Sequence, residues 1–145
     1  MNWIYLLISF FGGVGLAFQA SVNGELGQKI GTFETSLIGY TVGAVMLLCI
    51  TLLFGHGNIL MAANVTKWKL FVGVLGAMYM FIMVLSVPKI GAASAIIAGI
   101  MGQLVLGMIS DHFGLFGSPV IHFSGYRMAG IVLMFVATLL FYKRN

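Results

Sequence analysis

Three neutral amide side chains are the residues best placed for chemistry in a sequence that is otherwise apolar. Gln19 and Asn23 follow Gly15 at four-residue spacing, so the three positions share one stripe of a helix. Gln103 lies deep inside a later apolar run. Amide groups both donate and accept hydrogen bonds, and in lipid they need partners. These residues therefore either hold helices together or line a polar cavity that binds a small molecule.

The acidic residues lie at the ends of the expected helices and not inside the apolar runs. They are Glu25, Glu34 and Asp111. Asp111 precedes His112, a pair that either relays protons or gates a pathway near neutral pH, or has only a structural role at the membrane surface. A desolvated cation needs an opposite charge nearby, and no acid lies in the middle of an apolar run. A purely cationic substrate is therefore disfavoured.

The sequence has no pattern that is typical of an enzyme. The histidines His56, His112 and His122 are isolated in the expected loops and lack the spacing of metal ligands. The glycines follow helix faces and do not form a phosphate-binding loop. We therefore expect no enzyme activity, no metal and no cofactor.

The composition indicates which elements position these side chains. Apolar residues make up 61% of the 145 residues, charged residues 7%, and the mean hydropathy is +1.10, whereas a soluble domain carries about 25% charged residues. A helix that crosses a membrane needs about 20 mostly apolar residues. Five runs approach this length, and they are too long and continuous for the strands of a β-barrel. They are Trp3–Val22, Thr35–Phe54, Leu70–Val87, Ile90–Ser110 and Met128–Tyr142, the last of which we expect to begin near Gly125.

These runs predict an all-α, multi-pass protein of the bacterial inner membrane, built as a single five-helix transmembrane unit over residues 1–145. A short loop is expected at Gly24–Glu34, and a tight connection at Ser86–Lys89, where Pro88 cannot continue a helix. We see no internal repeat. The scattered basic residues predict contact with lipid headgroups and not with nucleic acid, and Arg127 is expected to extend toward the headgroups.

Small residues recur at every fourth position of the fourth run. Gly91, Ala95, Gly99 and Gly107 form this row, in which Gln103 also stands. Small side chains at this spacing let two helix backbones approach closely. We expect this face to be a helix-packing seam, the wall of a cavity, or both at the axis of a dimer.

The basic residues do not select one orientation in the membrane. If five helices alternate in direction, one side holds three cations and the other holds four. The first set is Lys67, Lys69 and Arg127, and the second is Lys29, Lys89, Lys143 and Arg144. The positive-inside rule needs a clear excess on one side. Either a few charges or a partner decides the orientation, or copies insert both ways and pair head to tail. The odd number of helices favours dual topology, because an inverted copy would complete a transporter of inverted repeats.

Three segments of the sequence resemble the YdcZ-like family of the drug/metabolite transporter superfamily. They are LAFQASVNGELGQKIGTFETSLIGY (Leu16–Tyr40), VPKIGAASA (Val87–Ala95) and GQLVLGMISDHFGLFG (Gly102–Gly117), in the expected order. The resemblance implies a five-helix unit equivalent to half of a ten-helix transporter. The related small multidrug resistance proteins use a membrane-embedded Glu in their first helix, where this chain has Gln19. The matched positions are Gln19, Asn23, Gly24, Pro88, Gly102, Gln103, Asp111, His112, Gly114 and Gly117.

Taken together, these features predict a small-molecule transporter that works by alternating access as an antiparallel homodimer. The substrate would be a small polar metabolite or a drug-like compound, bound between inverted copies of the first and fourth helices. Gln19, Asn23 and Gln103 would offer neutral hydrogen bonds, with Tyr40 and Tyr79 as wall residues. The alternatives are a subunit for assembly or regulation, a passive channel, or one half of a heteromeric pair.

Overall fold

Five helices in the described part of the chain are long and apolar enough to cross a membrane. The computed structural model describes residues 3–117 and 120–143, so Arg144 lies outside the described residues. The predicted all-α membrane fold is therefore confirmed. The chain divides into two compact units, residues 1–89 and 90–145, which are described separately below. The prediction of a single transmembrane unit over residues 1–145 stays a prediction.

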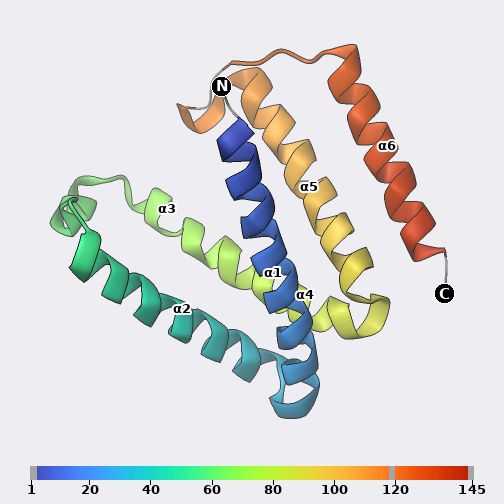
Figure 1. Cartoon of the computed structure of the whole chain (residues 1–145). Coiled ribbons are helices and arrows are strands. Elements are labelled where there is room, and N and C mark those ends of the chain that lie inside the picture. The colour runs from blue at the N-terminus through green and yellow to red at the C-terminus, as the bar shows by residue number, and fades with distance from the viewer. Residues whose placement is uncertain (1–2, 118–119, 144–145) are drawn as a thin grey trace. The chain divides into compact units, whose positions relative to one another are not determined.

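The first unit consists of three long helices and the segments that connect them (Figure 1). Helix α1 spans Trp3–Ile30 and α2 spans Thr32–Phe54. A 3₁₀ helix, η1 (Ile59–Asn64), and one short turn, α3 (Lys67–Leu70), lead into α4 (Val72–Ile90). Among the described residues of this unit, the buried ones lie in the second half of α4 and around the elbow between α1 and α2. Thr35 and Val84 are the most deeply buried side chains, at 0% and 2% exposure.

Helix α1 continues well beyond Val22, where its apolar run ends. The expected connection Gly24–Glu34 is therefore wrong, because Gly24 to Ile30 are helical. The polar extension contains Glu25 and Lys29 one turn apart, and their side chains form an ion pair of 2.6 Å. Such a pair supports a helix in water or headgroups. Hydropathy marks where the lipid ends, and this helix does not end there.

A single glycine connects α1 to α2. Gly31 has φ 104° and ψ 150°, a backbone conformation that is essentially restricted to glycine. The chain reverses there, and the N–H of Thr35 donates to the carbonyl of Gly31 at 3.1 Å. Figure 1 shows α1 and α2 meeting at this tight elbow. Glycine is required here because any side chain would be strained and would collide with the Glu34 carboxylate.

The end of α4 repeats this elbow sixty residues later. Lys89-Ile90-Gly91 has the same sequence as Lys29-Ile30-Gly31, and Gly91 has φ 80° and ψ 153°. The expected break at Ser86–Lys89 is wrong, because Pro88 lies inside α4 and the helix ends at Ile90. A proline near a helix end removes one hydrogen bond without ending the helix at once. The chain therefore contains a short internal repeat, contrary to the expectation above.

The repeat extends to the packing of α1 against α4. An added Cβ at Gly24 would lie 2.6 Å from Cγ1 of Val87, and one at Gly27 would collide with Val84. With an offset of sixty residues, Gly24 corresponds to Val84 and Gly27 to Val87. Each glycine therefore contacts the counterpart of the other, which is the reciprocal pattern of a two-fold axis. Helices α1 and α4 cross as an approximate two-fold pair with glycines at the crossing.

The second unit is a pair of adjacent helices, α5 (Ala92–Phe113) and α6 (Gly125–Tyr142). Helix α5 ends at Gly114, whose left-handed backbone (φ 61°) directs its N–H to the carbonyls of Ser110 and Asp111. A 3₁₀ turn, η2 (Leu115–Gly117), follows. Ser124 caps α6 by accepting a hydrogen bond from the N–H of Arg127 at 3.3 Å. The start of α6 at Gly125 agrees with the prediction.

We predict that alanine at either elbow glycine destabilises the protein. Gly31→Ala and Gly91→Ala should each lower the free energy of unfolding by about 1–3 kcal/mol, because Cβ disfavours their backbone conformation. Gly43→Ala is the matched control, since Gly43 lies within α2 with open space around it. That change should stabilise by about 0.5–1 kcal/mol. Unfolding in detergent measures all three, and elbow variants as stable as Gly43→Ala would contradict the role assigned to the elbows.

Candidate functional site

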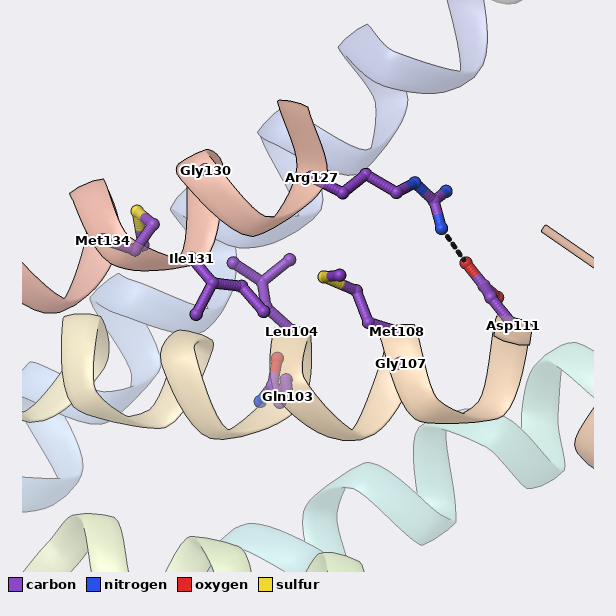
Figure 2. A pocket seen from close by; sticks show the side chains of 9 residues that line it. All are labelled: Gln103, Leu104, Gly107, Met108, Asp111, Arg127, Gly130, Ile131 and Met134. Atoms are coloured by element: carbon purple, nitrogen blue, oxygen red, sulfur yellow. Dashed lines mark hydrogen bonds and ion pairs between the residues drawn. The ribbon is translucent and has the colours of Figure 1, made fainter. Parts of the chain in front are cut away.

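A pocket of about 370 Å³ lies between α5 and α6, within the second unit. Figure 2 shows its lining side chains, which come from both helices. Helix α5 contributes Gln103, Leu104, Gly107, Met108 and Asp111, and α6 contributes Arg127, Gly130, Ile131 and Met134. This volume is within the usual range for small-molecule sites. The lining is mostly apolar, with polar groups at two levels, so the pocket suits an amphiphilic molecule.

The pocket exists because two glycines face the space between the helices. A Cβ added to Gly107 or Gly130 would meet no atom of the described residues within 4 Å. On α6, Arg127, Gly130 and Met134 share one face by their spacing. The row of small residues on α5 was expected to form a packing seam or the wall of a cavity. At Gly107, the row forms part of the pocket wall.

An ion pair joins the two helices at one end of the pocket. The Nη1 atom of Arg127 lies 3.3 Å from Oδ2 of Asp111, and both side chains are about one-third exposed, 33% and 31%. Figure 2 shows the guanidinium reaching across the gap to the carboxylate. Within the described chain Arg127 pairs with an acid on the neighbouring helix, and its extension toward the lipid headgroups stays a prediction. The pair leaves no net charge at this end of the pocket.

Gln103 lines the pocket two turns of α5 away from Asp111. Its amide makes no hydrogen bond to any residue in the described part of the chain. An amide in a membrane-spanning helix without a partner costs several kcal/mol in order of magnitude. Water in the pocket, a second copy of the chain or a bound molecule must therefore satisfy it.

His112, next to Asp111, is not one of the residues lining this pocket, and it contacts the loop that returns to α6. The N–H of Phe123 donates to its Nδ1 at 3.4 Å, and the Phe123 ring stacks on the imidazole at 4.1 Å. The ring of His122 meets it edge-on at 5.6 Å. The N–H of Ile121 donates to the carbonyl of Asp111 at 2.9 Å. Asp111 thus lines the pocket, whereas the adjacent His112 contacts the loop. A shared role of the two residues in gating or proton relay stays a prediction.

The other predicted binding residues all lie in the first unit. The Asn23 amide nitrogen on α1 is 3.8 Å from the Cβ position of Gly39 on α2, and the Tyr40 hydroxyl is 2.9 Å from the Cβ position of Gly76 on α4. Gln19 and Tyr79 are exposed on α1 and α4. The side chains of Gln19 and Asn23 make no hydrogen bond to described residues. A cavity that these residues share with Gln103 stays a prediction.

The predicted packing row on α5 does not behave uniformly. Gly91 lies before the helix and forms the second elbow, Ala95 is buried, and Gly107 lines the pocket. Gly99 is half-buried within α5. Whether this row meets a second copy of the chain stays a prediction.

The sequence is similar to a family of inner-membrane proteins along nearly its whole length. A family model described as "Putative inner membrane exporter, YdcZ" matches residues 4–140. The inner membrane protein YdcZ of Escherichia coli (strain K12) is 25% identical over 138 residues, which cover 92% of this chain and 91% of that protein. No solved structure matches the chain.

We predict that leucine is tolerated at the pocket glycines and not at the α1–α4 crossing. Gly107→Leu and Gly130→Leu should fill the pocket and leave the unfolding temperature nearly unchanged, because open space surrounds both positions. Gly27→Leu should destabilise by about 1–3 kcal/mol or more, because its side chain would enter Val84. Thermal unfolding in detergent tests this contrast. If Gly107→Leu is as harmful as Gly27→Leu, Gly107 lies in a seam and not in an open pocket.

Proposed function

Because the chain belongs to the YdcZ family of inner-membrane proteins, we propose that it is a small-molecule exporter that binds its substrate at the α5–α6 pocket. The protein crosses the inner membrane several times, so lipid is its surrounding partner. The family description supports transport in general. The substrate class, the dimer and the mechanism below are our own inferences.

The unpartnered amide of Gln103 carries the proposal. It lies in a membrane-spanning helix, faces a pocket of small-molecule size, and has no hydrogen bond within the described chain. A group that is costly to leave unpaired is retained where a ligand pairs with it. A small polar metabolite or a drug-like compound would place one hydrogen-bonding group on Gln103 and its apolar part against Leu104 and Ile131. No bond is made or broken in this process, so the proposed activity is transport and not catalysis.

We propose further that two copies assemble in opposite orientations and move the substrate by alternating access. The five helices have the size of one half of an inverted-repeat transporter. The cations are split three to four between the two sides. Each of the two sets of cations has one member in an ion pair, Lys29 with Glu25 and Arg127 with Asp111. Ion pairing therefore leaves the near balance between the two sets unchanged. In the assembled dimer, Gln19, Asn23, Tyr40 and Tyr79 would complete the site around Gln103, and Asp111 with His112 would gate it.

We predict that Gln103→Leu weakens ligand binding without unfolding the protein. Compounds that raise the unfolding temperature of the native chain should bind at least about tenfold more weakly to the variant, because one hydrogen bond to the ligand is lost. Gln28→Leu is the control, since Gln28 is an exposed amide on α1 outside the pocket. Equal binding by Gln103→Leu and the native chain would place the substrate site elsewhere.

We predict that the C-terminus lies on both sides of the membrane. Fusions of a reporter active only in the cytoplasm, and of one active only in the periplasm, should both give signal, because the cation split does not select an orientation. Two or three lysines added next to Lys67 should then fix one orientation. Signal from only one of the two reporters in the native chain would rule out dual topology, although a transporter of parallel or heteromeric chains would remain.

A further inference from the structure

The Asp111–Arg127 ion pair is only partly used within the described chain. One nitrogen of the guanidinium meets one oxygen of the carboxylate at 3.3 Å, whereas an arginine–carboxylate pair is frequently bidentate and shorter. Among the described residues, neither side chain makes another hydrogen bond or ion pair. Several N–H groups of Arg127 and one oxygen of Asp111 are therefore available. Both residues line the pocket.

The charge balance of the pair determines which ligands fit beside it. A cation on the available Asp111 oxygen gives this end of the pocket a net positive charge, and an anion on the available Arg127 N–H groups gives it a net negative charge. Next to an ion pair whose side chains are two-thirds buried, an uncompensated charge is unfavourable. A molecule with both charges can insert between the two side chains and replace one ion pair by two. A ligand with no charge leaves the available donors and acceptor unused.

We infer that the pocket selects a zwitterion with an apolar body, its cationic group on Asp111 and its anionic group on Arg127. The inference rests on the proposed function, since it names the substrate class of that site. The charged groups would lie at the end of the pocket formed by the last turn of α5 and the first turn of α6. The apolar body would extend along Met108 and Ile131 toward Gln103, which suits the mostly apolar lining.

The test uses one molecular skeleton in four charge states. Phenylalanine is the zwitterion, its methyl ester the cation, its N-acetyl derivative the anion, and the N-acetyl methyl ester the neutral form. Binding to the full chain in lipid nanodiscs is measured by calorimetry at about pH 6, where a free α-amino group is protonated and the carboxyl group ionised. The zwitterion should bind at least about tenfold more tightly than each of the other three, because it alone satisfies both charges.

Single neutralising variants should invert this preference in opposite directions. Asp111→Asn releases Arg127 and should make the N-acetyl anion the tightest ligand of the four. Arg127→Gln releases Asp111 and should make the methyl ester cation the tightest. Glu25→Gln is the matched control, because it breaks the ion pair with Lys29 on α1 outside the pocket. It should leave the native ranking unchanged.

The outcomes separate this inference from the proposed function. If the cation, the anion or the neutral form binds the native chain most tightly, and Gly130→Leu abolishes that binding, the pocket is a ligand site and the zwitterion assignment is wrong. An unchanged ranking in both Asp111→Asn and Arg127→Gln also overturns the assignment. If a ligand binds and Gly130→Leu does not weaken it, the pocket itself is not the site and the proposed function fails with it. The ranking in the native chain decides the question even if a variant does not fold.

Discussion

The absence of water in the hydrocarbon of a bilayer is the constraint on which this structure depends. Every backbone N–H and carbonyl must be paired internally, so the apolar runs form helices whose hydrogen bonds are local. Most side chains then face outward, because lipid covers them as well as protein would. This explains why a chain with 61% apolar residues buries so few of them, with Val84 and Met83 among the exceptions. A polar side chain without a partner raises the free energy of the folded protein in lipid. The positions of the polar side chains therefore indicate where partners or ligands are expected.

The elbows at Gly31 and Gly91 also leave few backbone groups unpaired. Each connects two helices through one residue. At both elbows the residue four positions on donates back to the glycine carbonyl at 3.1 Å. The next helix therefore begins within its first turn. Glycine at Gly24 and Gly27 then lets α4 approach α1 closely, which matters in lipid because close packing, and not exclusion of water, holds helices together.

Sequence patterns predicted the helices well and their ends poorly, for a physical reason. Length and hydropathy report residence in lipid, so five helices were predictable, but α1 continues to Ile30 on local contacts that hydropathy does not measure. Pro88 was read as a break, although a proline tolerates a position near the helix end. The Lys-Ile-Gly repeat is only three residues long, and its meaning depends on a backbone conformation that sequence does not display.

The candidate site was predictable only where its residues lie on one helix. The four-residue row on α5 identified Gln103, Gly107 and Asp111, because helical spacing fixes neighbours on one face. Arg127 is sixteen residues from its partner and joins it through a loop, so no spacing rule connects the two. The i, i+3, i+7 pattern of Arg127, Gly130 and Met134 was the available signal, and a terminal arginine is usually assigned to the headgroups.

A small residue permits close packing and an open hollow equally well, and the pocket shows how the two relate. At Gly27 a neighbouring helix occupies the place of the missing side chain, and at Gly107 and Gly130 no described residue does. An unfilled space beside an unpaired amide and a loosely paired ion pair is unfavourable for a chain on its own. It becomes favourable when another molecule enters, since the same groups then gain partners. In the proposed transporter, the hydrogen bonds and ion pairs that these groups form with a substrate would contribute to its affinity. The features that make this helix pair a poor core are thus the features that suit it to hold a transient ligand.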